Sequence, residues 1–343
     1  MANASSDTSC KPAAPIAVLG AGSWGTALAI QFARTGRHTV LWGRNAPHLK
    51  QLTSDRCNSR YLPDALFPDA LHIESKLASA IAATQDVLIA VPSHSLRALL
   101  LDIAPFLQTS MRIAWATKGF ELQTGLLPHQ IAAEVLGADL PMAVLSGPTF
   151  AREVGKGLPT AMTVAATDEA FARALAQSLS GNNFRVYTSA DVLGVEVGGA
   201  VKNVLAIGAG MSDGLGYGAN TRIALITRGL VEMTRLGVAL GANRETFMGL
   251  AGLGDLVLTC TDNLSRNRRF GLAVAAGQTS VQAQADIGQV VEGVQAAQAV
   301  HEVATTLNVE MPICEQVYGV LYQNIAPAFA VKQLMSRELK AET

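Results

Sequence analysis

The sequence predicts an α/β domain with a parallel sheet, followed by an all-helical domain. In the first half of the chain, short β-branched and apolar runs alternate with helical stretches, which is typical of βαβ units. A G-x-G-x-x-G segment lies between the first such run and the first helical stretch. After about Ser189 the strand pattern disappears, and alanine-rich helical stretches continue toward the C-terminus.

The expected elements follow the chain in order. The strands are Ile16–Leu19, Thr39–Trp42, Val87–Val91, Arg112–Ala116 and Met142–Leu145, followed by the segments TAMTVAA and FRVYTS. Helices are expected after a serine cap at Ser189, and at Thr221–Leu240, Arg268–Ala276, Glu292–Leu307 and Pro312–Gln323. We therefore predict a disordered tail over residues 1–14, a dinucleotide-binding domain over 15–190 and a helical substrate domain over 191–343.

The composition of the 343 residues limits the classes of function. The formal net charge is −1, which gives no reason to expect a nucleic acid as partner. The four cysteines (Cys10, Cys57, Cys260 and Cys314) form no C-x-x-C pair, so we expect reduced thiols and no metal site. No apolar run reaches the ~18 residues that a spanning helix needs, and the first residues lack an apolar signal core. We therefore expect a soluble, cytoplasmic protein without a membrane span.

The first strand continues directly into Gly20-Ala21-Gly22-Ser23-Trp24-Gly25 and then into a helix. Gly20 permits a tight turn, Gly22 lets the backbone approach a pyrophosphate, and Gly25 allows close packing of the helix on the strand. The helix N-terminus offers unpaired N–H groups to that anion. The alternative is that these glycines serve only as turn residues, but the strand–turn–helix context favours dinucleotide binding.

Arg44 follows the second expected strand, in the segment HTVLWGRN. An acidic residue at this position would bind the ribose 2′-hydroxyl of NAD, whereas an arginine suits the 2′-phosphate of NADP. We therefore expect NADP(H) to be used, alone or beside NAD(H). The alternative is an ordinary surface arginine.

Two further strands end in residues suited to substrate contacts, because ligands of open α/β sheets bind at the carboxyl ends of the strands. Lys118 follows one strand in ATKGF, and Gly147 and Thr149 follow the next in SGPTFA. We expect Lys118 to reach both cofactor and substrate, and the SGPTFA turn to expose backbone groups to polar substrate atoms. The alternative for Lys118 is a solvated loop lysine.

The helical domain contains two isolated charges. Lys202, in GGAVKN, has only small, apolar and amide neighbours nearby in the sequence. A lysine in such a setting has a lowered pKa and can act as a general acid or base near neutral pH. Asp255, in GLGDLVLTC, is equally isolated, and pairing with a lysine would explain it.

The segment SRNRRF places Ser265, Arg266 and Asn267 side by side, followed by two more arginines. A hydroxyl, a guanidinium and an amide together suit a phosphate group. A phosphate clamp and a basic surface turn are equally compatible with this segment alone.

Together these segments closely resemble the bacterial-type NAD(P)-dependent glycerol-3-phosphate dehydrogenases. Eight segments follow that family's order and spacing, from about Pro15 into the 320s: GAGSWGTALA, VLWGR, ATKGFE, SGPTFAREV, GGAVKNVLAIGAG, GLGDLVLTC, SRNRRFG and VVEGV. The resemblance implies a Rossmann-type N-terminal domain, a helical C-terminal domain and a homodimer, with the active site between the domains. The implied reaction is the reversible reduction of dihydroxyacetone phosphate to sn-glycerol 3-phosphate by NAD(P)H, which supplies glycerophospholipid synthesis.

The resemblance also implies roles for individual residues. Beside the glycines of the turn, the implied cofactor contacts are Ser23, Trp24, Arg44, Lys118, Ala151, Arg266, Val290 and Glu292. The implied substrate contacts are Lys118, Gly147, Thr149, Lys202, Asp255, Ser265, Arg266 and Asn267. Hydride transfer to the C2 carbonyl would place negative charge on its oxygen. We expect Lys202, held by Asn203 and Asp255, to protonate this oxygen, and Lys118 to stabilise its charge.

Two alternatives remain open. One is another β-hydroxyacid-type dehydrogenase with the same two domains and a carboxylate substrate. Phosphate would not protect such an enzyme against inactivation, whereas it would protect an enzyme with a phosphate site. The other is a cofactor-sensing binding protein, which needs the glycine turn but no general acid. Lys118, Lys202 and Asp255 argue against the second alternative.

Overall fold

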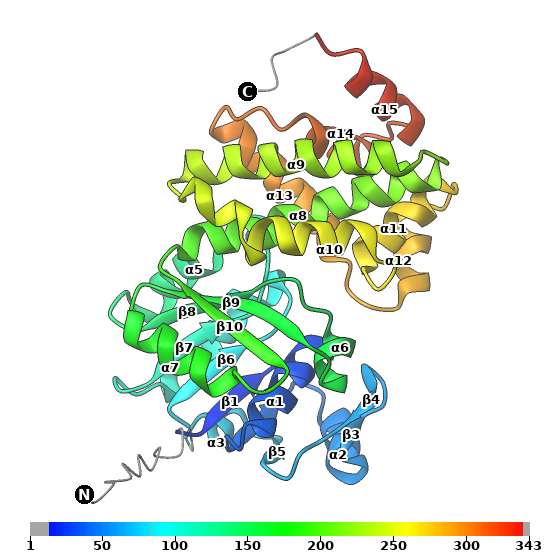
Figure 1. Ribbon diagram of the computed structural model, residues 1–343. Helices are drawn as coiled ribbons and strands as arrows, with labels where there is room; N and C mark the ends of the chain where they lie inside the picture. The colour runs from blue at the N-terminus through cyan, green and yellow to red at the C-terminus, as the bar shows by residue number, and fades with distance from the viewer. Residues whose placement is uncertain (1–13, 83, 339–343) are drawn as a thin grey trace, which may run out of the picture.

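The computed structural model describes residues 14–82 and 84–338, so the predicted tail lies outside the described residues except for its last position. An eight-stranded sheet with flanking helices forms the lower half of the molecule in Figure 1, and a helical bundle forms the upper half. The predicted fold class, an α/β Rossmann-type domain followed by a helical domain, is therefore confirmed.

The main sheet has the strand order β10-β9-β8-β7-β6-β1-β2-β5. Neighbouring strands are parallel except for β8 and β9, which are antiparallel. The strands are β1 (Ile16–Leu19), β2 (Thr39–Trp42), β5 (Leu71–Glu74), β6 (Asp86–Ile89), β7 (Arg112–Trp115), β8 (Met142–Ser146), β9 (Thr160–Ala166) and β10 (Phe184–Ser189). A separate antiparallel ribbon consists of β3 (Cys57–Asn58) and β4 (Leu62–Leu66).

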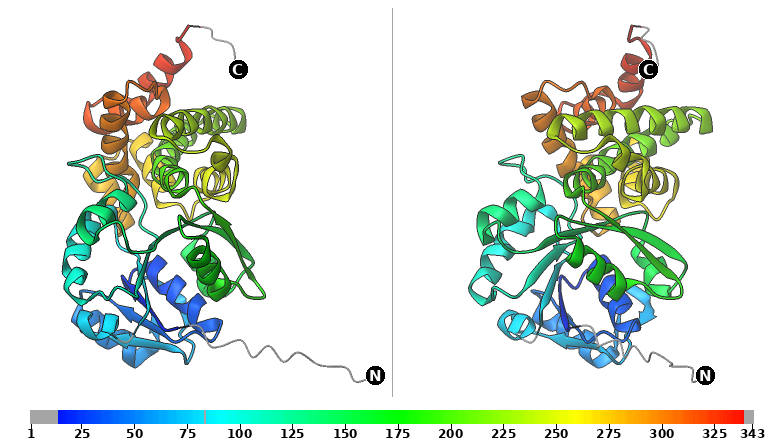
Figure 2. Two further views of the ribbon diagram at one scale, coloured as in Figure 1. Left: turned by 90° about the vertical axis from the view of Figure 1, so that its left-hand side faces the viewer. Right: turned by 60° about the vertical axis from the view of Figure 1, so that its left-hand side comes forward.

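Helices cover both faces of this sheet (Figure 2). Alternate residues of β1 show why: Ile16 and Val18 pack with α1 on one face, while Ala17 and Leu19 pack with α4 on the other. The helices are α1 (Ser23–Arg34), α2 (Ala46–Asp55), α3 (Leu77–Ala82), α4 (Leu96–Ile103), α5 (Pro128–Leu136), α6 (Ala151–Lys156) and α7 (Glu169–Leu179).

The strand predictions agree with the structure to within two residues at each end, but β3, β4 and β5 were not predicted. The edge strand β5 has the sequence LHIE, in which only Leu71 is buried. A short edge strand of this kind has neither the apolar run of a central strand nor a regular alternation over enough residues to be recognised.

The helical domain is arranged around α8 (Val192–Gly214), which is long and apolar enough to cross a membrane by composition. However, 89% of its most apolar window is buried inside the protein, so it is the core helix of this domain. Around it lie α9 (Ala219–Leu240), α10 (Asp255–Thr261), α11 (Arg266–Ala275), α12 (Ser280–Ile287), α13 (Glu292–Thr306), α14 (Pro312–Tyr322) and α15 (Pro327–Met335).

Two details of α8 differ from or extend the sequence prediction. Its N-cap is Asp191, whose carboxylate accepts from the N–H of Gly194 at 2.9 Å, and the predicted cap Ser189 is wrong because α8 begins later. Near its other end, Gly210 of α8 and Gly271 of α11 meet so closely that a Cβ on either would collide with the opposite backbone. This contact fixes α11, and with it the SRNRRF segment, against α8.

Candidate active site

The glycine turn lies between β1 and α1, as predicted. Gly20 has φ +129°, a conformation that favours glycine, and a Cβ on Gly25 would collide with the carbonyl oxygen of Gly20. Gly22 is the N-cap of α1, and no heavy atom lies within 4 Å of the position that its Cβ would take. The open space before a helix N-terminus fits the pyrophosphate of a dinucleotide.

A segment of the helical domain faces this turn. The hydroxyl of Ser23 donates to Oε1 of Gln289 at 3.5 Å, and Nη1 of Arg266 approaches the same oxygen at 3.4 Å. Gln289 precedes Val290, which is 42% exposed, and Glu292, the first residue of α13. The structure therefore brings four of the predicted cofactor residues to one region, and adds Gln289, which the sequence did not indicate.

The other predicted cofactor residues lie around the same edge of the sheet. Trp24 is in the first turn of α1 and packs partly buried on the sheet core, and Ala151 begins α6, which contacts α1. Arg44 follows β2, with a side chain that is 56% exposed and an Nη2 atom 3.9 Å from Oδ2 of Asp102. An exposed pair at this separation is weak, so the guanidinium remains available to a phosphate.

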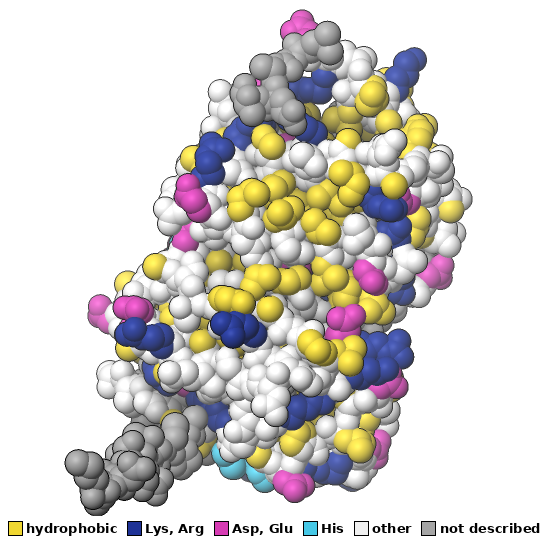
Figure 3. All heavy atoms as spheres, in the orientation of Figure 1, with side chains coloured by type: hydrophobic (Ala, Val, Ile, Leu, Met, Phe, Trp, Pro, Cys, Tyr) yellow, Lys and Arg dark blue, Asp and Glu magenta, His cyan; other side chains and the backbone are white. Residues whose placement is uncertain are grey.

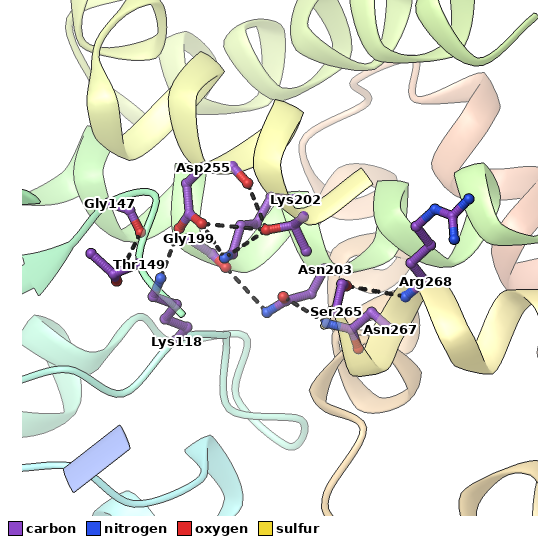
Figure 4. A network of polar contacts seen from close by, with 11 residues as sticks. Lys118, Gly147, Thr149, Gly199, Lys202, Asn203, Asp255, Ser265, Asn267 and Arg268 are labelled. Carbon is purple, nitrogen blue, oxygen red and sulfur yellow. Dashed lines mark hydrogen bonds and ion pairs between the residues drawn. The ribbon is translucent and has the colours of Figure 1, made fainter. Parts of the chain in front are cut away.

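The two predicted lysines converge on Asp255 (Figure 4). Nζ of Lys118 lies 2.7 Å from Oδ2 of Asp255, and Nζ of Lys202 lies 2.5 Å from Oδ1. The side chains of Lys202 and Asp255 are 9% and 2% exposed, whereas Lys118 is 14% exposed. The cluster therefore has two ammonium groups for one carboxylate, and a net positive charge.

Burial and these partners shift the pKa values in the cluster. Burial lowers the pKa of Lys202 to about 8, although the carboxylate of Asp255 offsets part of this effect. Burial alone would raise the pKa of Asp255, but the two ammonium groups together lower it below its ordinary value. Lys202 can therefore exchange its proton near neutral pH while Asp255 stays ionised.

The backbone explains how three distant segments reach one point. Lys118 follows the carboxyl end of β7, and Asp255 begins α10 directly after a π-helical turn, Leu250–Gly254. Lys202 is on α8, one turn beyond Gly199. A Cβ on Gly199 would lie 3.3 Å from Cγ of Lys118, so the absence of a side chain there lets the Lys118 stem cross α8 closely.

Asn203 does not hold Lys202, and this expectation is wrong. Nζ of Lys202 instead donates to Oγ1 of Thr259 at 3.1 Å, in addition to Asp255. The Asn203 amide donates to the carbonyl of Gly199 and accepts from Nδ2 of Asn267 at 2.8 Å. Consecutive residues of a helix point in directions about 100° apart, so Lys202 and Asn203 face different neighbours.

The SRNRRF segment forms the start of α11 beside this cluster. Ser265 is the N-cap and accepts from the N–H of Arg268 at 3.2 Å, and Oδ1 of Asn267 accepts from the N–H of Gly293 at 2.9 Å. The Arg268 side chain is buried, with its guanidinium on Asp213, Asn263 and the carbonyl of Cys260. Arg266 therefore differs from Arg268, because its side chain points toward the glycine turn.

Gly147 and Thr149 lie at the carboxyl end of β8, on the same edge of the sheet as Lys118. Gly147 has φ +149°, and a Cβ there would lie 2.9 Å from Cα of Met162. The Thr149 hydroxyl donates to the carbonyl of Gly147 at 3.2 Å. Among the residues that the structure describes, no three His, Cys, Asp or Glu side chains come together as a metal-binding group.

A glycine-rich turn at a helix N-terminus and a buried lysine–aspartate–lysine cluster both lie at the carboxyl edge of one mostly parallel sheet. This arrangement defines a two-domain, nicotinamide-dependent dehydrogenase. Sequence profiles of the NAD-dependent glycerol-3-phosphate dehydrogenase N-terminus and C-terminus match residues 15–172 and 191–332. The chain belongs to this family, which confirms the resemblance seen in the sequence.

Individual relatives agree with this assignment. A protein of Shewanella baltica named glycerol-3-phosphate dehydrogenase (NAD(P)+) is 58% identical over 334 residues, covering 97% of this chain and 99% of the relative. A relative of the same name from Klebsiella pneumoniae is 57% identical, covering 96% and 97%. The crystal structure of glycerol-3-phosphate dehydrogenase from Coxiella burnetii has a TM-score of 0.92 at 46% identity, covering 95% of this chain and 99% of that one. A dehydrogenase is thus favoured over a cofactor-sensing binding protein.

Proposed function

We propose that the protein reduces dihydroxyacetone phosphate to sn-glycerol 3-phosphate, reversibly and with NAD(P)H, in the cytoplasm, and that this supplies glycerophospholipid synthesis. The observation that carries the proposal is the buried cluster in which Lys118 and Lys202 share Asp255. It faces the carboxyl edge of the sheet, where the glycine turn begins α1. The family named above supports the choice of reaction.

In this proposal the sheet domain, residues 15–190, supplies most of the dinucleotide site, and the helical domain adds Arg266, Val290 and Glu292. The residues proposed to bind the dinucleotide are Gly20, Gly22, Ser23, Trp24, Gly25, Arg44, Lys118, Ala151, Arg266, Val290 and Glu292. NADH or NADPH, when bound, supplies the hydride. The exposed guanidinium of Arg44 would pair with the 2′-phosphate that distinguishes NADPH from NADH.

Lys202 donates the proton to the oxygen on C2 of the substrate. As the C2 carbonyl is reduced, negative charge develops on this oxygen, and the net positive charge of the cluster stabilises it. Lys118 contributes an ammonium group to this stabilisation. Asp255 keeps both Nζ atoms in place, and Thr259 accepts a further hydrogen bond from Lys202, so that its remaining N–H can be directed to the substrate.

The helical domain, residues 191–343, contributes the phosphate site in this proposal. Ser265, Arg266 and Asn267 would bind the substrate phosphate, and Gly147 and Thr149 would bind its polar atoms from the sheet side. Arg266 can form a charge-assisted bond to the anion. Binding energy from a remote phosphate then serves to orient C2 at the cluster, which lowers the barrier to reaction.

We also propose a homodimer. On the face shown in Figure 3, apolar side chains gather over α9. Ile223, Val231 and Val238 of α9 are 56%, 37% and 41% exposed, and their spacing places them on one side of the helix. A second copy of the chain covering this face would remove them from water. Light scattering of the wild type and of Ile223→Asp tests this: the proposal predicts a dimer that the substitution weakens, and a monomeric wild type contradicts it.

The reaction is tested by following the oxidation of NADPH and of NADH with dihydroxyacetone phosphate and with unphosphorylated dihydroxyacetone. The proposal predicts turnover with the phosphorylated ketone that far exceeds turnover with the other. Comparable rates with both ketones would contradict it. A preference for a 3-oxo or 2-oxo acid would also contradict it, and would favour the carboxylate-substrate alternative.

A further inference from the structure

A buried carboxylate outside the lysine cluster joins the two domains. Glu196 of α8 is 3% exposed. Its Oε1 accepts from the indole Nε1 of Trp115 at 2.8 Å and from the backbone N–H of His129 at 3.0 Å, and its Oε2 lies 2.5 Å from Nδ1 of His129. Trp115 ends β7, and His129 lies in the first turn of α5. One side chain of the helical domain therefore holds two elements of the sheet domain, at the junction visible in Figure 1.

Burial of Glu196 disfavours the ionised form of its carboxyl group. Burial raises the pKa of Glu196, and the bonds from His129 and Trp115 only partly offset that effect. An apolar side chain of similar size would avoid this desolvation. A carboxyl group that accepts from two N–H donors and contacts Nδ1 of His129 does something that an apolar side chain cannot do, because hydrogen bonds fix direction as well as distance.

The two segments that Glu196 joins both lead to the lysine cluster. Trp115 is the last residue of β7 and precedes Lys118 by three residues. On the other side, Glu196, Gly199 and Lys202 are at intervals of three along α8. Gly199 packs against the stem of Lys118, and Lys202 shares Asp255 with it. Among Glu196, Gly199 and Lys202, Glu196 is the residue that bonds to the sheet domain outside the lysine cluster.

We propose that Glu196 is a positioning residue. By holding Trp115 and His129, it sets where α8 lies relative to the end of β7 and the start of α5, and therefore how Lys202 and Lys118 are placed around Asp255. The inference rests on the proposed function, since it concerns the lysines to which that function assigns proton transfer and charge stabilisation.

The test compares Glu196→Leu with Glu196→Gln and with a matched control. Glu232 of α9 is also 3% exposed and accepts from the N–H groups of Ile313 and Cys314 at 2.7 and 3.1 Å, at the start of α14. Glu232→Leu therefore removes an equally buried carboxylate that contacts α14 and not the sheet domain. Glu196→Gln keeps an oxygen that can accept from Trp115 and from the His129 backbone.

Both leucine variants should have a lower melting temperature, because both leave buried N–H groups without a partner. Only Glu196→Leu should lower kcat for dihydroxyacetone phosphate, by about 10- to 100-fold, the range expected when reacting groups are displaced. Glu196→Gln should recover most of this loss, and the Kd for NADPH, measured by fluorescence, should stay unchanged in all three variants.

The proposal is overturned if Glu196→Leu keeps kcat within about twofold of wild type, or if Glu232→Leu loses kcat equally. Loss of NADPH binding in Glu196→Leu would also overturn it, because that result indicates general damage. If Glu196→Leu does not fold, Trp115→Phe decides: it removes one donor, and an unchanged kcat overturns the proposal. A wild type without activity on dihydroxyacetone phosphate would instead refute the proposed function.

Discussion

Replacing Asp255 by asparagine removes the carboxylate from between two ammonium groups. Nζ of Lys118 and Nζ of Lys202 lie 2.7 and 2.5 Å from its two oxygens, and the Asp255 side chain is only 2% exposed. Asparagine has nearly the same shape and keeps one acceptor. The variant therefore tests the charge of the carboxylate separately from its volume.

The expected loss of stability at pH 7 is about 3–5 kcal/mol, the range for removing one partner of a buried ion pair. The two lysines can reduce this loss by releasing a proton, so the pKa of Lys202 should fall further below its value of about 8. In the unfolded chain the same lysine keeps its proton up to about pH 10. Between the lowered pKa of Lys202 in the folded variant and about pH 8, the unfolded form of the variant therefore binds more protons than its folded form. The free energy of unfolding of Asp255→Asn consequently rises with pH over this range relative to that of wild type.

Urea unfolding followed by circular dichroism at several pH values measures both effects. The control is Asp286→Asn, at an exposed carboxylate of α12, which should change stability by no more than about 0.5 kcal/mol. At neutral pH, kcat of Asp255→Asn should fall at least about 100-fold, because a deprotonated Lys202 cannot donate. A loss of stability below about 1 kcal/mol, or one that grows between pH 6 and 8, would show that the Asp255 carboxylate does not hold the two ammonium groups by its charge.

Three further variants test other parts of the site. Arg44→Asp should weaken NADPH binding by about 1.5–3 kcal/mol and shift preference toward NADH; an unchanged ratio of kcat/KM for the two cofactors would remove Arg44 as the discriminator. Arg266→Ala should raise KM for dihydroxyacetone phosphate by about 10- to 100-fold and affect unphosphorylated dihydroxyacetone much less, whereas equal losses would indicate a structural or cofactor role. Gly25→Ala should weaken NADPH binding, measured by fluorescence, because its Cβ would collide with the carbonyl of Gly20, and normal binding would show that the turn can relax.

Features that depend on nearby residues were predictable from the sequence. The strand–glycine turn–helix unit from β1 to α1 needs only a local pattern, and so does the end of the strand signal before α8. The isolation of Lys202 and Asp255 among apolar residues correctly indicated that they pair, because an unpaired charge is rarely kept in such surroundings.

Contacts between distant segments were not predictable. Thr259 and Gln289 are ordinary polar residues whose partners, Lys202 and Ser23, lie 57 and 266 positions away. Glu196 is likewise surrounded by apolar residues in the sequence, and only the docking of α8 against the sheet domain shows that it bonds to Trp115, 81 positions away. Asn203 does not contact Lys202 for a related reason: adjacent residues of a helix point in different directions, so neighbours in the sequence need not touch.

Lys202 is the residue proposed to supply the proton in the reduction. Lys202→Met keeps much of the volume of the stem and removes the ammonium group, and kcat and the Kd for NADPH are measured on the same folded preparation. If Lys202 is the proton donor, kcat should fall about 10²–10⁴-fold with NADPH binding unchanged. The kcat/KM of wild type should also fall as the pH rises through about 8, where Lys202 loses its proton. The residual activity of Lys202→Met should show no such fall near pH 8. A near-normal kcat in Lys202→Met, or the same loss of activity near pH 8 in both proteins, would contradict this role of Lys202.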